Sequence, residues 1–106
     1  MNIMDILIAA KCLIQNPEAW TQNKFARDMY WEPVETESDE ACKFCAMGAI
    51  SRIYLKNNLT LKDYEFARSA LQNAAWQLKR VSAVEINDFY QHGDVMEMFD
   101  IAIKNC

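Results

Sequence analysis

The sequence predicts a mainly α-helical fold with a minor β component, organised as a compact four-helix domain. Hydrophobic residues make up 52% of the chain, whereas Gly and Pro contribute only two residues each. Apolar side chains recur at helical spacing, and residues typical of helix caps precede them. A short β-hairpin or extended insertion is expected between the first and second helices. The 106 residues correspond to one ordinary domain, so we expect a single domain over 1–106.

The first helix is predicted from Asn2 or Ile3 to Gln15. It stops before Pro17, because the residue that precedes a proline avoids helical geometry. This helix is apolar nearly all round, at Ile3, Met4, Ile6, Leu7, Ile8, Leu13 and Ile14. A helix without a clear polar face is usually central or lies at an interface. We therefore expect it to be central or to form a homodimer contact.

Residues 20–34 form the predicted insertion. The segment is rich in aromatic side chains and ends near Pro33. Its alternation of apolar and polar residues is poor, so a two-stranded hairpin and an ordered loop both remain open.

The second helix is predicted to begin after Ser38, a good N-cap residue followed by two acids, and to end at Leu55 or Lys56. A strip of small side chains runs along it, at Ala41, Cys45, Gly48 and Ala49. A glycine inside a helix costs roughly 1 kcal/mol relative to alanine. Gly48 therefore indicates close packing of another backbone.

The third helix is predicted over 61–80, where Thr60 and Asp63 resemble a capping box. Its apolar stripe comprises Tyr64, Ala67, Leu71, Ala74, Ala75 and Leu78. Residues 81–91 are interpreted as a connector with a short strand at 84–86. Asp94 is interpreted as the cap of the fourth helix, whose inward residues are Val95, Met98, Phe99, Ala102 and Ile103.

Composition and charge exclude several classes of function. The net charge is −4 and no run of Lys or Arg occurs, so nucleic acid is not an expected partner. Five acids gather between Glu32 and Glu40. The apolar run 6–14 contains Lys11 and is too short to span a membrane. Four cysteines without a basic leader predict a reducing, cytoplasmic location.

Cys42 and Cys45 form a C-x-x-C motif, predicted to lie in the first two turns of the second helix. A redox pair is one interpretation, since a helix N-terminus lowers a thiol pKa. Free cysteines more often fill a core, and Cys42 is placed on the buried face, so we favour core packing. Zinc would require two further ligands, and we expect neither a metal nor a cofactor.

His92 is the only histidine. A constellation of Cys45 as nucleophile, His92 as base and Asp88 as orienting group is conceivable. Because His92 precedes Gly93, a solvated turn residue is the favoured interpretation. We therefore lean against an enzyme.

A small-ligand or enzymatic site is the alternative function. It would form where the insertion meets the second helix and the connector, using Trp20, Arg27, Cys45, Asn87 and Asp88. The structural interpretations compete with it. Short polar side chains such as Asn87 and Asp88 usually bind local backbone groups, and Arg27 is expected to pair with a neighbouring carboxylate, Asp28 or Asp88.

The leading hypothesis is a non-enzymatic protein-interaction module, a regulator or inhibitor of another protein. Trp76 falls on a polar face of the third helix, and Trp is enriched among binding hot spots. Trp31 and Tyr30 of the insertion offer a second contact surface. The competing interpretation is that the insertion folds over Trp76.

Several segments together resemble a family of small bacterial and phage domains whose function is not established. The matching segments are Trp20-Thr21-Gln22, Ala26-Arg27-Asp28, Phe44 to Ile50, Ile86-Asn87-Asp88, and Asp94 to Ile103. The resemblance implies the order helix, hairpin, helix, helix, helix and carries no activity. It makes a phage-related origin part of the leading hypothesis.

Overall fold

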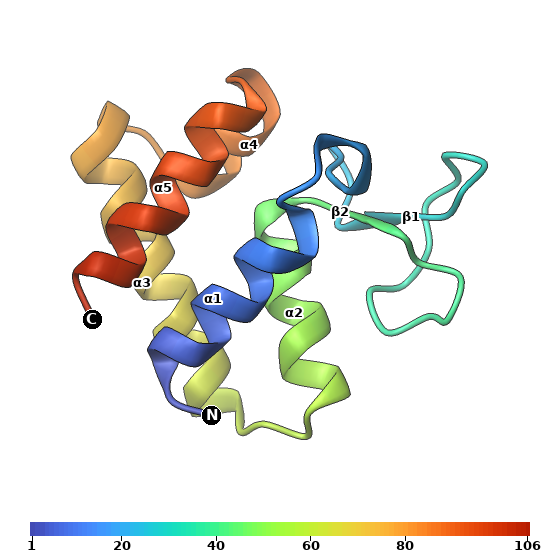
Figure 1. Cartoon of the computed structure of the whole chain (residues 1–106), viewed down its shortest axis with the longest axis horizontal. Helices are drawn as coiled ribbons and strands as arrows, with labels where there is room; N and C mark the ends of the chain where they lie inside the picture. Colours follow the sequence, from blue (N-terminus) through green and yellow to red (C-terminus); the bar gives the residue numbers. More distant parts are fainter.

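A computed structural model describes all residues from 1 to 106 (Figure 1). The elements in chain order are α1 (Ile3–Ile14), the 3-10 helix η1 (Pro17–Ala19), β1 (Ala26–Arg27), β2 (Lys43–Phe44), α2 (Ala46–Lys56), α3 (Leu61–Lys79), α4 (Ala83–Phe89) and α5 (His92–Lys104). The mainly helical class is confirmed. The predicted count of four helices is one too low, because five α-helices are present.

Helix α1 lies between the other long helices, as its apolar composition predicts. It packs against α2 on one side and against α5 and α3 on the other (Figure 1). Its inner face is fully buried at Ile6, Leu7, Ala10 and Ile14. The side chain of Asn2 accepts the N–H of Asp5 at 2.8 Å and caps the helix. Such a cap typically contributes about 1 kcal/mol.

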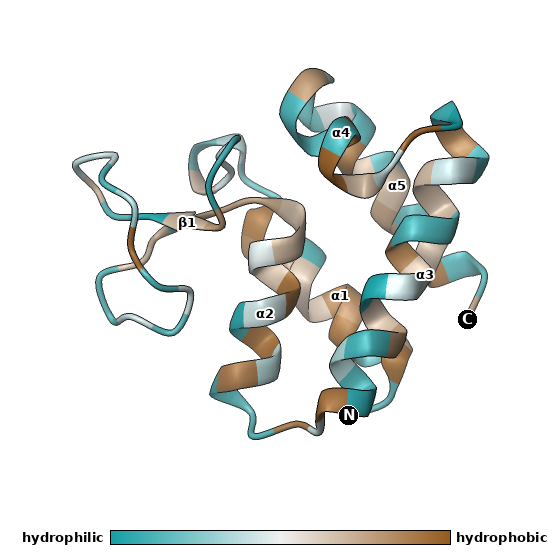
Figure 2. Cartoon of the chain, turned by 180° about the vertical axis from the view of Figure 1, so that it is seen from behind, coloured by the Kyte–Doolittle hydropathy of each residue, from teal (hydrophilic) through white to brown (hydrophobic).

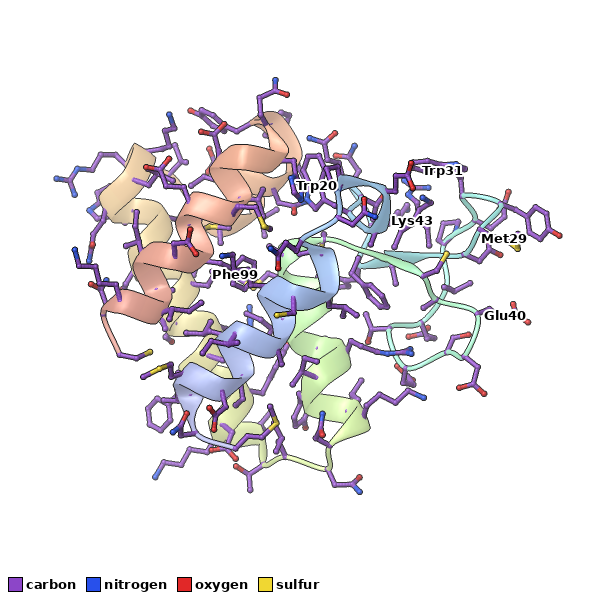
Figure 3. All side chains as sticks on the ribbon, viewed as in Figure 1. Trp20, Met29, Trp31, Glu40, Lys43 and Phe99 are labelled. Carbon is purple, nitrogen blue, oxygen red and sulfur yellow. The ribbon has the colours of Figure 1, made fainter.

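Helix α3 follows its prediction closely. Thr60 and Asp63 form the capping box that opens it. Its buried positions are Ala67, Leu71, Ala74 and Ala75. Helix α3 packs against α5, which carries Phe99, the largest of the fully buried side chains (Figure 3). Hydrophobic segments of the helices turn toward this shared core, whereas the loops on the far side of α2 are mostly hydrophilic (Figure 2). None of the helices combines the length and apolar composition needed to cross a membrane.

Helix α2 begins at Ala46, so its predicted start after Ser38 is wrong. The Ser38 hydroxyl accepts the N–H of Glu40 at 3.1 Å and forms a local turn instead. Residues 43–44 are extended because they pair with β1, and the helix is capped by Cys45. A tertiary pairing thus overrides a local capping signal.

The second strand lies beyond the predicted insertion, within which a single antiparallel bridge joins Arg27 and Pro33. Ala26 lies opposite Phe44 and Arg27 opposite Lys43 in an antiparallel register. Residues 21–44 consequently form a single projection beside α2, which we call the lobe (Figure 1). A Cβ placed on Gly48 would lie 1.9 Å from the carbonyl oxygen of Phe25. The predicted close packing at Gly48 is confirmed, and its partner is the backbone of the lobe.

The connector at 81–91 is a helix, so the predicted strand at 84–86 is wrong. Ser82 caps α4 by accepting the N–H of Glu85 at 3.1 Å. Asp94 is also not the N-cap of the last helix. Its carboxylate accepts the N–H of Gln91, which precedes α5, at 3.1 Å. In both places the capping residue stands three positions before its acidic partner.

Candidate functional site

The side chain of Asn87 joins three separate segments of the chain. It is 2% exposed. Its Oδ1 accepts the indole N–H of Trp20 at 2.7 Å and the backbone N–H of Ala46 at 2.9 Å. Its Nδ2 donates to the carbonyl of Thr21 at 3.1 Å and to Asp88 Oδ1 at 2.9 Å. All four hydrogen-bonding positions of the amide are therefore occupied within the protein.

Gln22 ties the start of the lobe to the end of α4. Its Nε2 lies 3.1 Å from the carbonyl oxygen of Asn87, 3.2 Å from that of Asp88 and 3.3 Å from that of Tyr90. The last carbonyls of a helix lack intrahelical donors, so this amide satisfies groups that would otherwise need water. Asp88 also accepts the N–H of Asn23 at 2.9 Å. Residues that sequence reasoning treated as a ligand site thus hold the lobe in place.

Arg27 serves the interior of the lobe. Its Nε donates to the hydroxyl of Thr21 at 2.9 Å, and its Nη1 donates to the carbonyl of Trp31 at 2.8 Å. The three ion pairs of the molecule involve other residues. The predicted pairing of Arg27 with Asp28 or Asp88 is therefore wrong, because backbone carbonyls of a tight turn receive the guanidinium.

Cys45 is buried and caps α2, because its Sγ accepts the N–H of Gly48 at 3.2 Å. Burial raises the pKa of the Cys45 thiol to about 11, since a thiolate is poorly stabilised away from water. The expected lowering by the helix dipole is thus outweighed. Cys42 is exposed and precedes β2, so its predicted position on a buried helical face is wrong. Cys45 fills the core as predicted, whereas Cys42 does not.

His92 is half-buried at the start of α5, so it is not the solvated turn residue that was predicted. Its Nε2 lies 2.8 Å from the carbonyl oxygen of Ile14, and its ring meets Trp20 edge-on at 5.3 Å between centroids. The hydrogen bonds of His92 and Cys45 go to different groups, and no hydrogen bond joins them. No three His, Cys, Asp or Glu side chains are placed to hold a metal ion.

A cavity of about 310 Å³ opens beside the N-terminus of α2. Its lining residues are Asn23, Lys24, Phe25, Cys45, Met47, Val84, Asn87 and Asp88. It brings together Cys45, Asn87 and Asp88 of the predicted ligand set, whereas Trp20 and Arg27 do not line it. The cavity forms where the insertion, α2 and the predicted connector meet, but its apolar lining residues Phe25, Met47 and Val84 were not among the residues predicted for a site.

The outer turn of the lobe displays three neighbouring large side chains to solvent. Met29 is 69% exposed, Tyr30 76% and Trp31 58%. We call residues 28–32 the tip. Asp28 Oδ1 accepts the N–H groups of Tyr30 and Glu32 at 2.9 and 3.0 Å, and the backbones of Asp28 and Glu32 bond at 2.9 Å. The tip is therefore an ordered turn and not a loose loop.

Trp31 is held in a conformation that bulky residues rarely adopt. Its φ is 68°, in the left-handed region. The ammonium of Lys43 lies 4.3 Å from the centroid of the Trp31 ring, and its Nζ also donates to the carbonyl of Glu18 at 2.6 Å (Figure 3). Such strained positions persist where the surroundings fix them, and they concentrate at functional sites.

Trp76 belongs to the last turn of α3, a helix whose C-terminal end lies away from the lobe (Figure 1). It is 57% exposed, and the guanidinium of Arg80 lies 5.8 Å from its ring centroid. The interpretation that the insertion folds over Trp76 is therefore wrong. The ring remains an exposed aromatic on a separate face.

The fold and the candidate site define a small helical domain that carries a rigid, aromatic-tipped lobe. Over residues 1–105 the chain matches the model of a family described as a family of unknown function (DUF6197). The chain belongs to that family. No curated protein and no solved structure matches the chain.

Proposed function

We propose that this protein is a non-enzymatic interaction module, a regulator or inhibitor that binds another protein through the tip of its lobe. The observation that carries the proposal is the display of Met29, Tyr30 and Trp31 on a turn fixed by hydrogen bonds. Free thiols at Cys12, Cys42 and Cys106 support a reducing compartment, which we take to be the cytoplasm.

The tip is already ordered in the free protein, which lowers the entropic cost of binding a partner. Association normally costs roughly 0.5–1.5 kcal/mol for each flexible side chain or loop position that becomes fixed. Asp28 and Arg27 already fix the tip through three hydrogen bonds of 2.8 to 3.0 Å. Trp and Tyr dominate binding hot spots because they bury large areas with few rotatable bonds. An ordered aromatic turn is thus suited to dock into a pocket on a partner.

Affinity capture from the native cell tests this proposal. We expect the Tyr30→Ala/Trp31→Ala variant to lose partner binding roughly 30-fold or more, since hot-spot truncations cost about 2 kcal/mol or more. Trp76→Ala is the matched control, because it removes an equally exposed aromatic from another face. Alanine and tryptophan are both L-residues with a Cβ, so the left-handed backbone at position 31 costs about the same with either. Trp31→Ala should therefore affect folding little.

The two variants separate the surfaces. Loss of the partner with Trp76→Ala alone would move the interaction to α3. Retention of every partner by both variants would exclude both aromatic surfaces, and with them the proposed mode of binding.

The cavity of about 310 Å³ supports a second candidate function, the binding of a small, mainly apolar ligand. Its volume is at the lower end of small-molecule sites, which run from about 300 to 1,000 Å³. A thermal-shift screen of nucleotides and metabolites tests it, because a ligand at a hundred times its dissociation constant adds about 2.7 kcal/mol. A true occupant should lose its shift in Val84→Trp, which fills the rim. A negative result across a broad library would exclude this candidate.

A further inference from the structure

A second hollow, of about 390 Å³, lies on the lobe between β1, the loop 33–37 and the end of α2. Its apolar lining includes Phe25, Val34 and Leu55, of which Phe25 and Leu55 are exposed. Its acidic lining consists of Glu35 and Glu37, which are also exposed. We call this hollow the acidic groove. Apolar and negatively charged surfaces therefore meet within one concave site.

The acidic side of the groove is held rigidly by α2. Arg52 Nη1 donates to the carbonyls of Thr36 and Ser38 at 2.8 and 2.7 Å. The hydroxyls of Thr36 and Ser51 lie 3.1 Å apart and form a further hydrogen bond. Because the loop is tied at three points, Glu35 and Glu37 are presented from a fixed backbone.

The two glutamates that line the groove have no ion-pair partner within the molecule, and the guanidinium of Arg52 beside them is occupied by backbone carbonyls. Of the five acids between Glu32 and Glu40, only Asp39 has an ion pair, at 3.3 Å from the ammonium of Lys56. Lys24 is the one basic residue that lines the groove. Like charges held near one another repel, and a cationic partner relieves that repulsion. The same charge disfavours an acidic peptide or a nucleic acid.

We propose that the acidic groove binds a basic, amphipathic segment of a partner protein. The aliphatic stem of a lysine or arginine packs on Phe25 and Leu55, while its charged end lies between Glu35 and Glu37. Such side chains routinely bury their stems on apolar surface and keep the charge near polar groups. This inference rests on the proposed function, because the tip precedes the groove directly in the chain and one partner contacts both.

Fluorescence anisotropy with two labelled peptides tests the groove without the native partner. One probe consists of repeated Lys-Leu-Ser units, and the other replaces every Lys with Glu. We expect the cationic probe to bind, with an affinity that falls as salt rises, and the anionic probe not to bind. Absence of binding by the cationic probe, or equal binding of both probes, would overturn the inference.

A pair of charge-matched variants then locates the site. Glu35→Gln/Glu37→Gln removes two acids from the groove, whereas Glu18→Gln/Glu40→Gln removes two exposed acids that belong neither to the groove nor to the tip. We expect the first variant to weaken the cationic probe roughly tenfold and the second less than about twofold. Equal weakening would show attraction to the net charge alone, and no weakening would show binding elsewhere. Either result contradicts the proposal that the acidic groove binds the cationic probe.

The experiments can contradict binding by the groove without contradicting binding by the tip. If the native partner is lost with Tyr30→Ala/Trp31→Ala but is unaffected by Glu35→Gln/Glu37→Gln, the interaction module stands and the groove does not. If sedimentation shows that the chain occupies its own groove as a dimer, which Glu35→Gln/Glu37→Gln dissolves, the second copy replaces the basic partner.

Discussion

At the scale of single residues, the C-x-x-C motif shows how position decides the chemistry of a side chain. Cys45 is buried and accepts a backbone N–H at the start of α2, whereas Cys42, three residues earlier, faces solvent. Their spacing is identical to that of redox pairs, yet the burial of Cys45 favours the protonated thiol. Within the motif, Cys45 acts as the N-cap of α2.

The raised pKa of Cys45 predicts a loss of stability in alkali. The folded thiol titrates near 11, whereas the ordinary value is 9.0, so the unfolded state releases its proton first as the pH rises. The free energy of unfolding should be unaffected by this group below pH 9 and should fall by roughly 2–3 kcal/mol as the pH approaches 11.

Urea unfolding at a series of pH values measures this effect, as the difference between the wild type and Cys45→Ala. Cys42→Ala is the control, because it removes the exposed thiol of the same motif. Parallel curves for the wild type and Cys45→Ala would contradict a raised pKa.

The hydrogen-bond partners of Asn87 could not be predicted from the sequence. A structural role on local backbone groups was expected, but Asn87 binds distant ones, the carbonyl of Thr21 and the N–H of Ala46. Its partners lie 66 and 41 positions away, so no local pattern could have named them.

At the scale of elements, the contact of α2 with the lobe depends on the absence of one side chain. Gly48→Ala would place a Cβ 1.9 Å from the carbonyl oxygen of Phe25. This carbonyl is held by the N–H of Cys45 at 3.1 Å and cannot yield easily, so we expect a loss of about 1–3 kcal/mol in unfolding free energy. Urea denaturation measures it.

Gly93→Ala is the matched control, because nothing lies within 4 Å of a Cβ built at Gly93 in α5. Here alanine should be neutral or should add up to about 1 kcal/mol, through its higher helix propensity. Equal effects of the two substitutions would mean that Gly48 does not carry a close contact.

Prediction of the elements succeeded where local and tertiary signals agree. Helix α3 has a clear apolar stripe, α1 is stopped by Pro17, and both begin after true capping residues, so their bounds follow from the sequence. The start of α2 was misplaced because the turn-forming hydroxyl of Ser38 resembles a cap. Helix α4 was missed because seven residues are too few for a clear period, although Ser82 and Glu85 carry the spacing of a capping box.

At the scale of the whole molecule, the helices and the lobe are joined by buried hydrogen bonds that converge on Asn87. Its loss would strand the indole N–H of Trp20 and the N–H of Ala46 without an acceptor. Each unsatisfied buried group costs about 1–3 kcal/mol. The lobe and the helices should therefore unfold in one transition in the wild type. Without the Asn87 side chain, the lobe should unfold first.

We expect tryptophan fluorescence and far-ultraviolet circular dichroism to give coincident urea transitions in the wild type, as for one cooperative domain. In Asn87→Ala the fluorescence change should come first, and stability should fall by roughly 3–5 kcal/mol. Asn73→Ala, on the exposed face of α3, is the control and should leave both transitions in place. Coincident, unshifted transitions in Asn87→Ala would contradict the coupling.

The candidate site was harder to predict than the fold, for a physical reason. Exposed aromatics such as Tyr30 and Trp31 could be named from composition. The groove could not, because Phe25 and Leu55 become neighbours only when β1 pairs with residues that the sequence assigned to a helix.

The tip and the acidic loop are held mainly through backbone atoms, by Arg27 below one and Arg52 below the other. Outward-facing side chains such as Tyr30 and Glu37 thus contribute little to the stability of the two loops. Substitutions at these positions should therefore leave the scaffold unchanged. New recognition sequences could consequently be introduced into the lobe by mutation or by design. The helices that carry it would not need to be redesigned.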